Sequence, residues 1–141
     1  MNDLTFAIIK PDAIKNKKTG LILDHILKSG FNIVCAKLTK MTLNQAEGFY
    51  EIHSERPFFA ELTNFMSSGQ SMVLVLEKEN AVDEWRKTIG STNPEEAEEG
   101  TIRKLYATSI GENSVHGSDS SENAHKEIAF FFSNCEIISN T

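Results

Sequence analysis

Short runs of apolar residues recur along the chain and predict its β-strands. The run TFAIIK at 5–10 stops at Pro11, and SMVLVLE at 71–77 is the strongest strand signal in the sequence. Continuous apolar runs of this length are typical of strands that are buried on both faces of a sheet. Two further runs, at 31–39 and 135–138, complete the set. The pattern therefore predicts four strands, the last of them at 135–138.

Helical periodicity fills the segments between these runs. Apolar residues recur at helical spacing over 20–29, and Gly30 is well placed as the C-terminal cap of that helix. Thr42 and Gln45 have the spacing of a capping box, so a helix should run from there through Tyr50. The remaining predicted helices and helical turns lie at 59–66, 81–89 (capped by Asn80), 93–96, 102–105 and 119–131, the last starting between Asp119 and Glu122.

The order of these elements predicts an α+β fold. A strand, a helix and a strand are followed by helices, a strand, a helix, a long polar loop over 100–116, a helix and a strand. This order favours a ferredoxin-like split βαβ sandwich, with a four-stranded antiparallel sheet, helices and a polar active-site loop. No repeat or linker interrupts 1–141, so we expect a single domain. Enzymes, regulators and RNA-binding modules share this fold, so it does not decide the function.

The acidic composition narrows the range of partners. The chain has 141 residues, 40% of them hydrophobic, and a net charge of -6 at pH 7. Nucleic-acid and membrane-surface binders need a basic face, so neither partner is expected, and any polyanion would need a local positive cluster. The apolar runs are too short to span a bilayer and no signal-peptide pattern is visible, which favours a cytoplasmic location. Cys35 and Cys135 are expected to be buried, reduced thiols.

The densest group of polar residues is NSVHGSDS at 113–120, with His116 at its centre. An imidazole is a good nucleophile and is mostly uncharged at neutral pH. Gly117 beside it removes a side chain and helps to expose the ring to a ligand. Taken alone, Ser118 and Asp119 are ordinary helix-capping residues, and a single histidine is more often structural than catalytic.

Positive residues elsewhere in the chain predict a phosphate site. Lys10 directly follows a buried strand, Arg86 lies beside the apolar face of its helix, and Arg103 lies in a polar segment. Guanidinium groups bind phosphate oxygens in pairs, through strong charge-assisted hydrogen bonds. Each of these residues taken singly is more often a solvated surface charge. Neither a P-loop nor a G-x-G-x-x-G motif is present, and the remaining histidines have no metal-ligand spacing: His25, His53 and His125.

Four motifs resemble the nucleoside diphosphate kinase family. NSVHGSDS at 113–120, GTIR at 100–103, IKPDA at 9–13 and ERPFF at 55–59 match it in order over nearly the whole chain, and the first motif is highly specific. The resemblance implies a ferredoxin-like fold, which agrees with the predicted strands. It also implies a ping-pong reaction that maintains nucleoside triphosphate pools: a triphosphate phosphorylates a histidine, and a different nucleoside diphosphate then collects the phosphate.

The resemblance also implies a role for each matched residue. His116 corresponds to the residue phosphorylated on Nδ1, and Glu127 and Ser118 correspond to the pair that orients it. Tyr50 corresponds to the residue that positions Lys10. The implied nucleotide-binding residues are Lys10, Arg86, Thr92 and Arg103 for the phosphates, Asn113 for the ribose 3′-hydroxyl, and Phe58, Ile110 and Leu62 for the base. Mg²⁺ is expected to bridge the phosphates, held by substrate oxygens and water, because no carboxylate cage is evident.

Three positions depart from the family pattern: Gln70 stands in place of proline, Leu105 in place of an acidic residue, and Phe49 in place of histidine. None of them is a matched catalytic residue, so they bear on loop rigidity and subunit contacts and not on the chemistry.

The implied base contacts are stacking contacts only, which predicts that the site accepts purine and pyrimidine nucleotides alike. The resemblance also implies a homo-oligomer that pairs through strand 31–39, and a tetramer is favoured over a hexamer.

Two other classes of protein use the same fold. An RNA-binding module needs interleaved aromatic residues on its central strands and a basic face, and strands 5–10 and 71–77 carry one aromatic residue between them. A non-catalytic nucleotide sensor is the alternative to an enzyme. Such a sensor does not need a phosphorylatable histidine beside a supporting carboxylate. Transfer of phosphate from ATP to a second nucleoside diphosphate separates these hypotheses.

Overall fold

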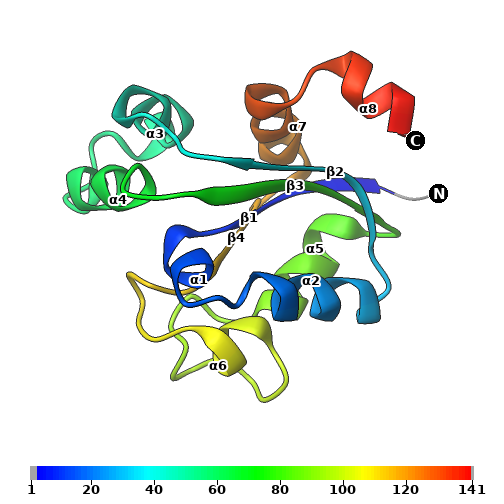
Figure 1. Cartoon of the computed structure of the whole chain (residues 1–141), viewed down its shortest axis with the longest axis horizontal. Helices are drawn as coiled ribbons and strands as arrows, with labels where there is room; N and C mark the ends of the chain where they lie inside the picture. Colours follow the sequence, from blue (N-terminus) through cyan, green and yellow to red (C-terminus); the bar gives the residue numbers. More distant parts are fainter. Residues whose placement is uncertain (1–2, 141) are drawn as a thin grey trace.

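Residues 3–140 are described by the computed structural model, and they form a four-stranded sheet between two layers of helices (Figure 1). The strands are β1 (Asp3–Ile9), β2 (Asn32–Thr39), β3 (Ser71–Lys78) and β4 (Val115–Gly117). Their order in the sheet is β2-β3-β1-β4, and all neighbouring pairs are antiparallel. This is the order of the ferredoxin-like split βαβ sandwich, so the predicted fold class is confirmed.

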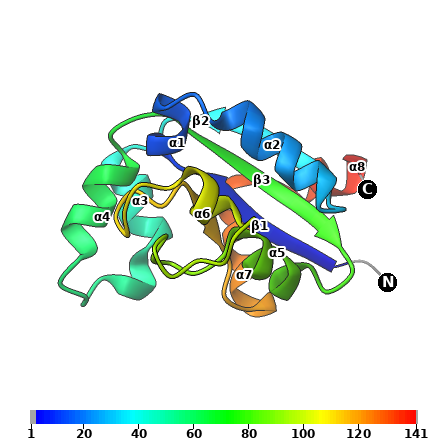
Figure 2. The ribbon, with the colours of Figure 1, turned by 90° about the horizontal axis from the view of Figure 1, so that it is seen from below.

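The helices cover both faces of the sheet, as two views at right angles show (Figures 1 and 2). One layer contains α3 (Leu43–Phe49), α4 (Phe59–Met66), α7 (Ser121–Phe131) and α8 (Asn134–Asn140), with a 3₁₀ turn, η1 (Glu51–His53), between α3 and α4. The opposite layer contains α1 (Pro11–Lys15), α2 (Thr19–Lys28), α5 (Ala81–Ile89) and α6 (Ile102–Tyr106).

Each face of the sheet carries its own apolar core, and β1 contributes to both. Phe6 and Ile8 belong to the core under α3, α4 and α7, while Ala7 and Ile9 belong to the core under α2 and α5. All four side chains are buried. Burial on both faces explains why this strand shows a continuous apolar run instead of an alternating one.

Several local signals act as predicted. Gly30 ends α2 with a φ of 92°, a conformation that glycine adopts without steric cost. Thr42 and Gln45 form both hydrogen bonds of the capping box at the start of α3, at 3.0 and 2.9 Å. α4 has the predicted limits. The Thr101 hydroxyl accepts the Lys104 amide, and α6 begins where a helical turn is predicted.

The predicted strand at 135–138 is wrong, because this segment forms helix α8. Ser133 and Glu136 exchange two hydrogen bonds at the start of the helix, at 3.0 and 3.1 Å, in the pattern of a capping box. The Lys37 ammonium, on β2, donates to the Phe131 carbonyl at 2.6 Å and pairs with Glu136 at 3.4 Å, which ties α8 to the sheet. The Ser-x-x-Glu spacing indicates the start of a helix, whereas the apolar run at 135–138 predicts a strand.

The fourth strand lies instead inside the segment predicted as a polar loop. β4 covers Val115–Gly117 and pairs with β1, with His116 opposite Ile8. Three residues with polar neighbours give neither an apolar run nor an alternation, so the sequence pattern does not reveal them. The strand forms because its peptide groups complete the hydrogen bonding of β1 along the edge of the sheet. His116 therefore lies on a strand and not on a loop.

Smaller corrections concern caps and thiols. Asn80 precedes α5 with a φ of 57°, but its side chain makes no cap hydrogen bond. Ser120, and not Asp119, caps α7 by accepting the Asn123 amide at 3.1 Å. Cys35 is buried as expected, whereas Cys135 is exposed, and both are free thiols. Among residues 3–140, no helix has both the length and the apolar character needed to cross a bilayer.

Candidate active site

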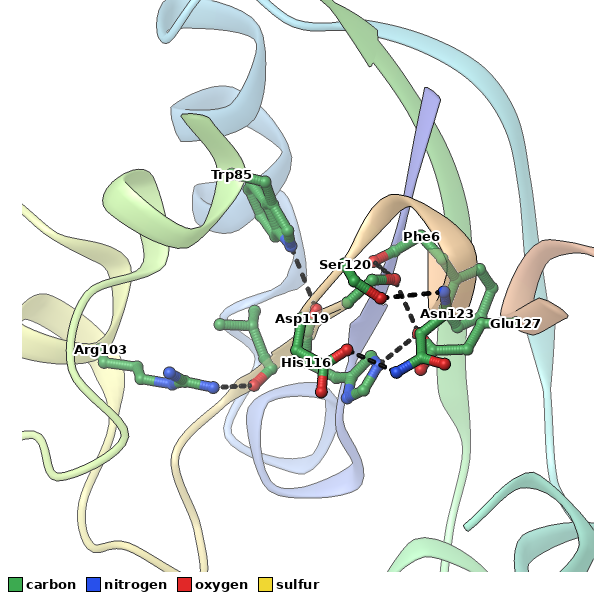
Figure 3. A network of polar contacts seen from close by, with 10 residues as sticks. Phe6, Trp85, Arg103, His116, Asp119, Ser120, Asn123 and Glu127 are labelled. Atoms are coloured by element: carbon green, nitrogen blue, oxygen red, sulfur yellow. Dashed lines mark hydrogen bonds and ion pairs between the residues drawn. The ribbon is translucent and has the colours of Figure 1, made fainter. Parts of the chain in front are cut away.

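The backbone around His116 is anchored from the side opposite its ring (Figure 3). The indole Nε1 of Trp85, on α5, donates to the His116 carbonyl oxygen at 3.1 Å. The Arg103 guanidinium, on α6, donates through Nη2 to the Val115 carbonyl at 2.9 Å. Trp85 is fully buried, so water cannot replace the His116 carbonyl if β4 moves away. The indole N–H would then be left unsatisfied, which is unfavourable. These bonds, together with the pairing to β1, fix the strand that carries the candidate nucleophile.

Gly117 lets β4 approach α5 closely, and an alanine here is expected to distort the site. A Cβ at this position would lie 2.8 Å from Trp85 Cδ1 and 3.1 Å from Ile89 Cδ1. We expect Gly117→Ala to lower the free energy of unfolding by about 1–3 kcal/mol and to slow turnover. Thermal unfolding and steady-state rates measure both effects.

Gly20→Ala, in α2, is the matched control for this substitution. A Cβ on Gly20 meets no atom within 4 Å. Alanine also has the higher helix propensity, so we expect unchanged or slightly raised stability. Equal thermal stability of the two variants would contradict the close packing of Gly117 against α5.

A carboxylate holds the imidazole of His116, and a hydroxyl holds that carboxylate (Figure 3). Glu127, on α7, has Oε1 at 2.8 Å from His116 Nε2, and the same oxygen accepts the Ser118 hydroxyl at 2.7 Å. A carboxylate only accepts, so Nε2 carries the ring proton and the lone pair lies on Nδ1. The side chains of His116 and Glu127 are 17% and 20% exposed, so a ligand can reach the ring. The structure thus brings together the three residues that the sequence singled out.

Aromatic rings lie around the imidazole on its core side. The centroids of Phe49, Phe6 and Tyr50 lie 5.5, 6.1 and 6.2 Å from that of His116. Among residues 3–140, the buried Tyr50 hydroxyl has no hydrogen-bond partner. Burial, with a smaller contribution from Glu127, raises the pKa of this group. A hydrogen bond from Tyr50 to Lys10, which the implied positioning role would suggest, is therefore not seen.

Lys10 is held instead by Asn113. The ammonium Nζ donates to Asn113 Oδ1 at 2.9 Å, and Asn113 Nδ2 donates to the Thr92 carbonyl at 3.2 Å. Burial, followed by repulsion from Arg103, lowers the pKa of Lys10 from 10.5 to about 8, while Asp12 acts in the opposite direction. A buried cation with this poor solvation gains from the arrival of an anion.

A cleft of about 620 Å³ next to β4 contains the other positive residues. Arg86, Thr92 and Arg103 line it together with two carboxylates, Glu96 and Glu98, and it extends to Gly117, the residue that follows His116. Arg103 donates from both terminal nitrogens to backbone carbonyls at 2.9 Å. Burial and then repulsion from Arg86 lower the pKa of Arg103 to about 10, so it stays charged at neutral pH. Two guanidinium groups and a threonine suit this cleft to phosphate.

The residues expected at the base lie on a different part of the surface. Phe58, just before α4, is 45% exposed, and Ile110, in the segment after α6, is 59% exposed. Leu62 is half-buried and packs against the core under α4. The Phe58 ring lies 5.6 Å from that of His53. An exposed aromatic face of this kind is available for stacking on a base.

Three backbone contacts in the site escaped the sequence pattern. They are the bonds from Trp85 to the His116 carbonyl, from Arg103 to the Val115 carbonyl, and from the Ser114 amide to Asp12. Backbone partners leave no residue signature at the receiving position. The one available signal was the need of a buried indole N–H for an acceptor.

Among the described residues, the site does not contain a set of side chains that could hold a metal ion without the nucleotide. Within the part of the chain that the structure describes, no group of three or more His, Cys, Asp and Glu side chains converges on a common point. A cation that arrives on phosphate oxygens, with water completing its coordination, needs no such group.

The fold and the site together define a phosphotransferase. An oriented histidine with a free ring nitrogen lies beside a cleft whose positive groups suit phosphate.

Comparisons with known proteins identify the family. A family model described as nucleoside diphosphate kinase matches residues 3–137. The chain is 55% identical over 134 residues to the nucleoside diphosphate kinase of Wolbachia sp. subsp. Drosophila simulans, covering 95% of this chain and 96% of the relative. It is 56% identical over 138 residues to that of Phenylobacterium zucineum, covering 98% and 99%. A crystal structure of the Aquifex aeolicus nucleoside diphosphate kinase matches with a TM-score of 0.95 and 44% identity, covering 97% of this chain and 99% of that chain.

The chain belongs to the nucleoside diphosphate kinase family. Its reaction is the transfer of a phosphate group from a nucleoside triphosphate to a nucleoside diphosphate, and the reaction of this family needs a divalent cation. A non-catalytic nucleotide sensor is not favoured.

Proposed function

We propose that His116 carries the phosphate between the two halves of this reaction, as a phosphohistidine formed on Nδ1. The observation that carries the proposal is the bond from Nε2 to Glu127, which leaves the Nδ1 lone pair free. In the first half, this lone pair bonds to the γ-phosphorus, and the nucleoside diphosphate leaves with the electron pair of the broken P–O bond. In the second half, an oxygen of the acceptor's terminal phosphate attacks, and the P–N pair returns to Nδ1.

Glu127 and Ser118 are proposed to orient the imidazole and stabilise its charge. Attack through Nδ1 places positive charge on the ring, and a carboxylate oxygen 2.8 Å from Nε2 stabilises that charge where it develops. The Ser118 hydroxyl, at 2.7 Å, keeps this oxygen in place. The proton stays on Nε2 through both halves, so no proton transfer is needed.

The phosphates are proposed to bind to positive groups from three elements. Lys10 follows β1, Arg86 lies on α5 and Arg103 on α6, and phosphate transfer depends mainly on alignment and positive charge. Mg²⁺ is the proposed cation, held by phosphate oxygens and water; when bound, it neutralises charge on the phosphates. The other proposed contacts are Thr92 with the phosphates, Asn113 with the ribose 3′-hydroxyl, Tyr50 as support for the site, and Phe58, Ile110 and Leu62 with the base.

A coupled assay tests this function. With ATP, GDP and Mg²⁺, the enzyme is expected to form GTP, and similar rates with pyrimidine diphosphates are expected from a stacked base. Binding of nucleotide without turnover would support a sensor and contradict the proposal.

The buried ammonium group of Lys10 predicts a loss of activity at alkaline pH. We expect kcat/KM for ATP to fall through about pH 8, where Lys10 loses its charge in the free enzyme. Stability should change in the opposite direction. Between the folded pKa of about 8 and the ordinary value of 10.5, the unfolded chain binds more protons at Lys10, so this group's contribution to the free energy of unfolding rises with pH.

Lys10→Met tests this assignment because methionine has no charge to lose. The variant is expected to be slower at neutral pH and to lack the fall near pH 8. Thermal unfolding at each pH distinguishes titration from denaturation. An unchanged alkaline fall in Lys10→Met would contradict the role of Lys10.

We also propose that the protein is a cytoplasmic homo-oligomer, with a tetramer favoured over a hexamer. β2 is an edge strand, and Leu38 on this strand is 51% exposed, which suits pairing with a second copy. Two free thiols suit a reducing compartment. Light scattering measures the oligomeric state, and a monomer would contradict this part of the proposal.

A further inference from the structure

The residue before β4 has a backbone conformation that few residues other than glycine adopt. Ser114 is fully buried and has a φ of 73°. The Val115 amide donates to the Asn113 carbonyl at 2.9 Å, which closes a γ-turn with Ser114 at its centre. A γ-turn with positive φ is rare and strained, and it persists only where its surroundings hold it. Because the turn lies between Asn113 and His116, its shape sets the position of both residues.

Two groups from the start of the chain hold this turn. Asp12 Oδ2 accepts the Ser114 amide at 3.0 Å, and the Lys10 amide donates to the Ser114 carbonyl at 2.8 Å. Both peptide groups of the strained residue therefore bond to a segment about 100 positions earlier in the sequence. Asp12 belongs to α1, a five-residue helix that the sequence pattern did not predict.

The burial of Asp12 supports a specific role for its carboxylate. The side chain is buried, and burial raises its pKa, while the Ser114 amide, the charge of Lys10 and the amides of Asp12 and Ala13 act in the opposite direction. Burial of a carboxylate is unfavourable unless hydrogen bonds compensate for lost water. Within the described part of the chain, neither Oδ1 nor the Ser114 hydroxyl has a hydrogen-bond partner. The contact between Asp12 and the turn is therefore the backbone amide.

Asp12 lies away from the phosphate cleft. It lines a separate cleft of about 490 Å³, together with Phe65, Gln70 and Glu112, whereas the cleft beside His116 is lined by the arginine residues. Asp12 can then act on the reaction through the turn, or through its charge, which raises the pKa of Lys10. Asp12→Asn keeps an acceptor oxygen and removes the charge, so it separates these two routes. Alignment of reacting groups is worth a large factor in rate, and a displacement of about 1 Å costs on the order of 10²-fold.

We propose that Asp12 is a positioning residue for the phosphate transfer: its carboxylate holds the γ-turn at Ser114 and thereby sets the position of His116 against the γ-phosphate. This inference rests on the proposed role of His116 as the phosphate carrier. The essential property of Asp12 is an acceptor oxygen at 3.0 Å from the Ser114 amide. A neutral side chain of the same shape should therefore replace it.

Phosphorylation of the enzyme by ATP and Mg²⁺ alone, in single turnovers near neutral pH, tests this requirement. We expect Asp12→Ala to lower the rate constant by about 10- to 100-fold, with the Kd for ATP within about threefold. Asp12→Asn keeps an acceptor oxygen and should stay within about threefold of the original rate. Asp12→Glu keeps the charge but displaces the oxygens by one methylene, so it should be as slow as Asp12→Ala.

Hydrogen exchange at the Ser114 amide gives a second readout that does not depend on activity. Exchange should be faster in Asp12→Ala and Asp12→Glu, and slow in Asp12→Asn. Ile26→Val controls for general destabilisation, because Ile26 is buried in the core under α2. This variant should unfold at a lower temperature and keep its rate of phosphorylation.

A folded Asp12→Ala variant with a rate within about twofold of the original would overturn the proposal, and so would Asp12→Asn that is as slow as Asp12→Ala. Where the alanine and glutamate variants do not fold, Asp12→Asn decides: a retained rate with slow exchange supports the proposal, and a large loss of rate with slow exchange contradicts it. Should the unmodified enzyme form no phosphohistidine, the role of His116 fails, and the exchange data still show whether Asp12 holds the turn.

Discussion

His116→Ala is expected to abolish phosphate transfer and to remove the phosphorylated intermediate with it. Alanine offers no lone pair to the γ-phosphorus, so the remaining site can bind nucleotide but cannot begin the first half-reaction. Removal of a nucleophile is among the most damaging substitutions known in enzymes, and we expect a loss of at least about 10⁴-fold in kcat. The coupled assay with ATP and a second diphosphate measures this loss.

His125→Ala is the matched control for His116→Ala. His125 is exposed on α7, the same helix that carries Glu127, and it has no proposed contact with nucleotide. Its rate should equal that of the unmodified enzyme. The substitution also removes the contacts of residue 116 with the neighbouring rings. Thermal unfolding of His116→Ala therefore distinguishes a loss of the nucleophile from a loss of the fold. Near-normal turnover by folded His116→Ala would exclude His116 as the phosphate carrier.

Glu127→Ala has the second largest expected effect. The substitution removes the acceptor 2.8 Å from His116 Nε2 and leaves the Ser118 hydroxyl without its strong partner. The ring then loses both its orientation and the stabilisation of its positive charge. We expect kcat to fall by about 10²-fold, with a smaller change in the KM for ATP because Glu127 is not among the residues proposed to bind the phosphates.

Two further variants show whether Glu127 acts through the imidazole. Glu122→Ala, also on α7, removes an exposed carboxylate that pairs with Lys126 at 3.5 Å, and its rate should be unchanged. Ser118→Ala should be slower than the unmodified enzyme but faster than Glu127→Ala. Because Ser118 acts through Glu127, the double variant should be no slower than Glu127→Ala. Additive losses in the double variant would show that the two side chains act independently.

The sequence pattern predicted three of the four strands because β1, β2 and β3 carry apolar runs. β4 was not predicted, since three residues at the sheet edge are selected by the open hydrogen bonds of β1 and not by their own side chains. The apolar run at 135–138 led to the wrong prediction of a strand for a related reason. Its apolar residues belong to a helix that Ser133 and Glu136 start, and Lys37 holds that helix against β2.

The same contrast applies to the site. His116 and Ser118 were predicted from a motif, and Glu127 from the family resemblance. Glu127 Oε1 lies within hydrogen-bond distance of both other side chains. The contacts of Trp85 and Asp12 were not predicted, because each bonds to a peptide group far away in the sequence. Such contacts depend on how the elements pack, and a motif read along the chain contains no information about that packing.

Transfer of a labelled phosphate in two separate steps tests the central claim most directly. The enzyme is mixed with γ-labelled ATP and Mg²⁺, freed of nucleotide, examined by mass spectrometry, and then given GDP. The account predicts one acid-labile phosphate per chain, located on His116, which passes to GTP when GDP is added. A label on another residue, or GTP formation without any labelled enzyme, would contradict it.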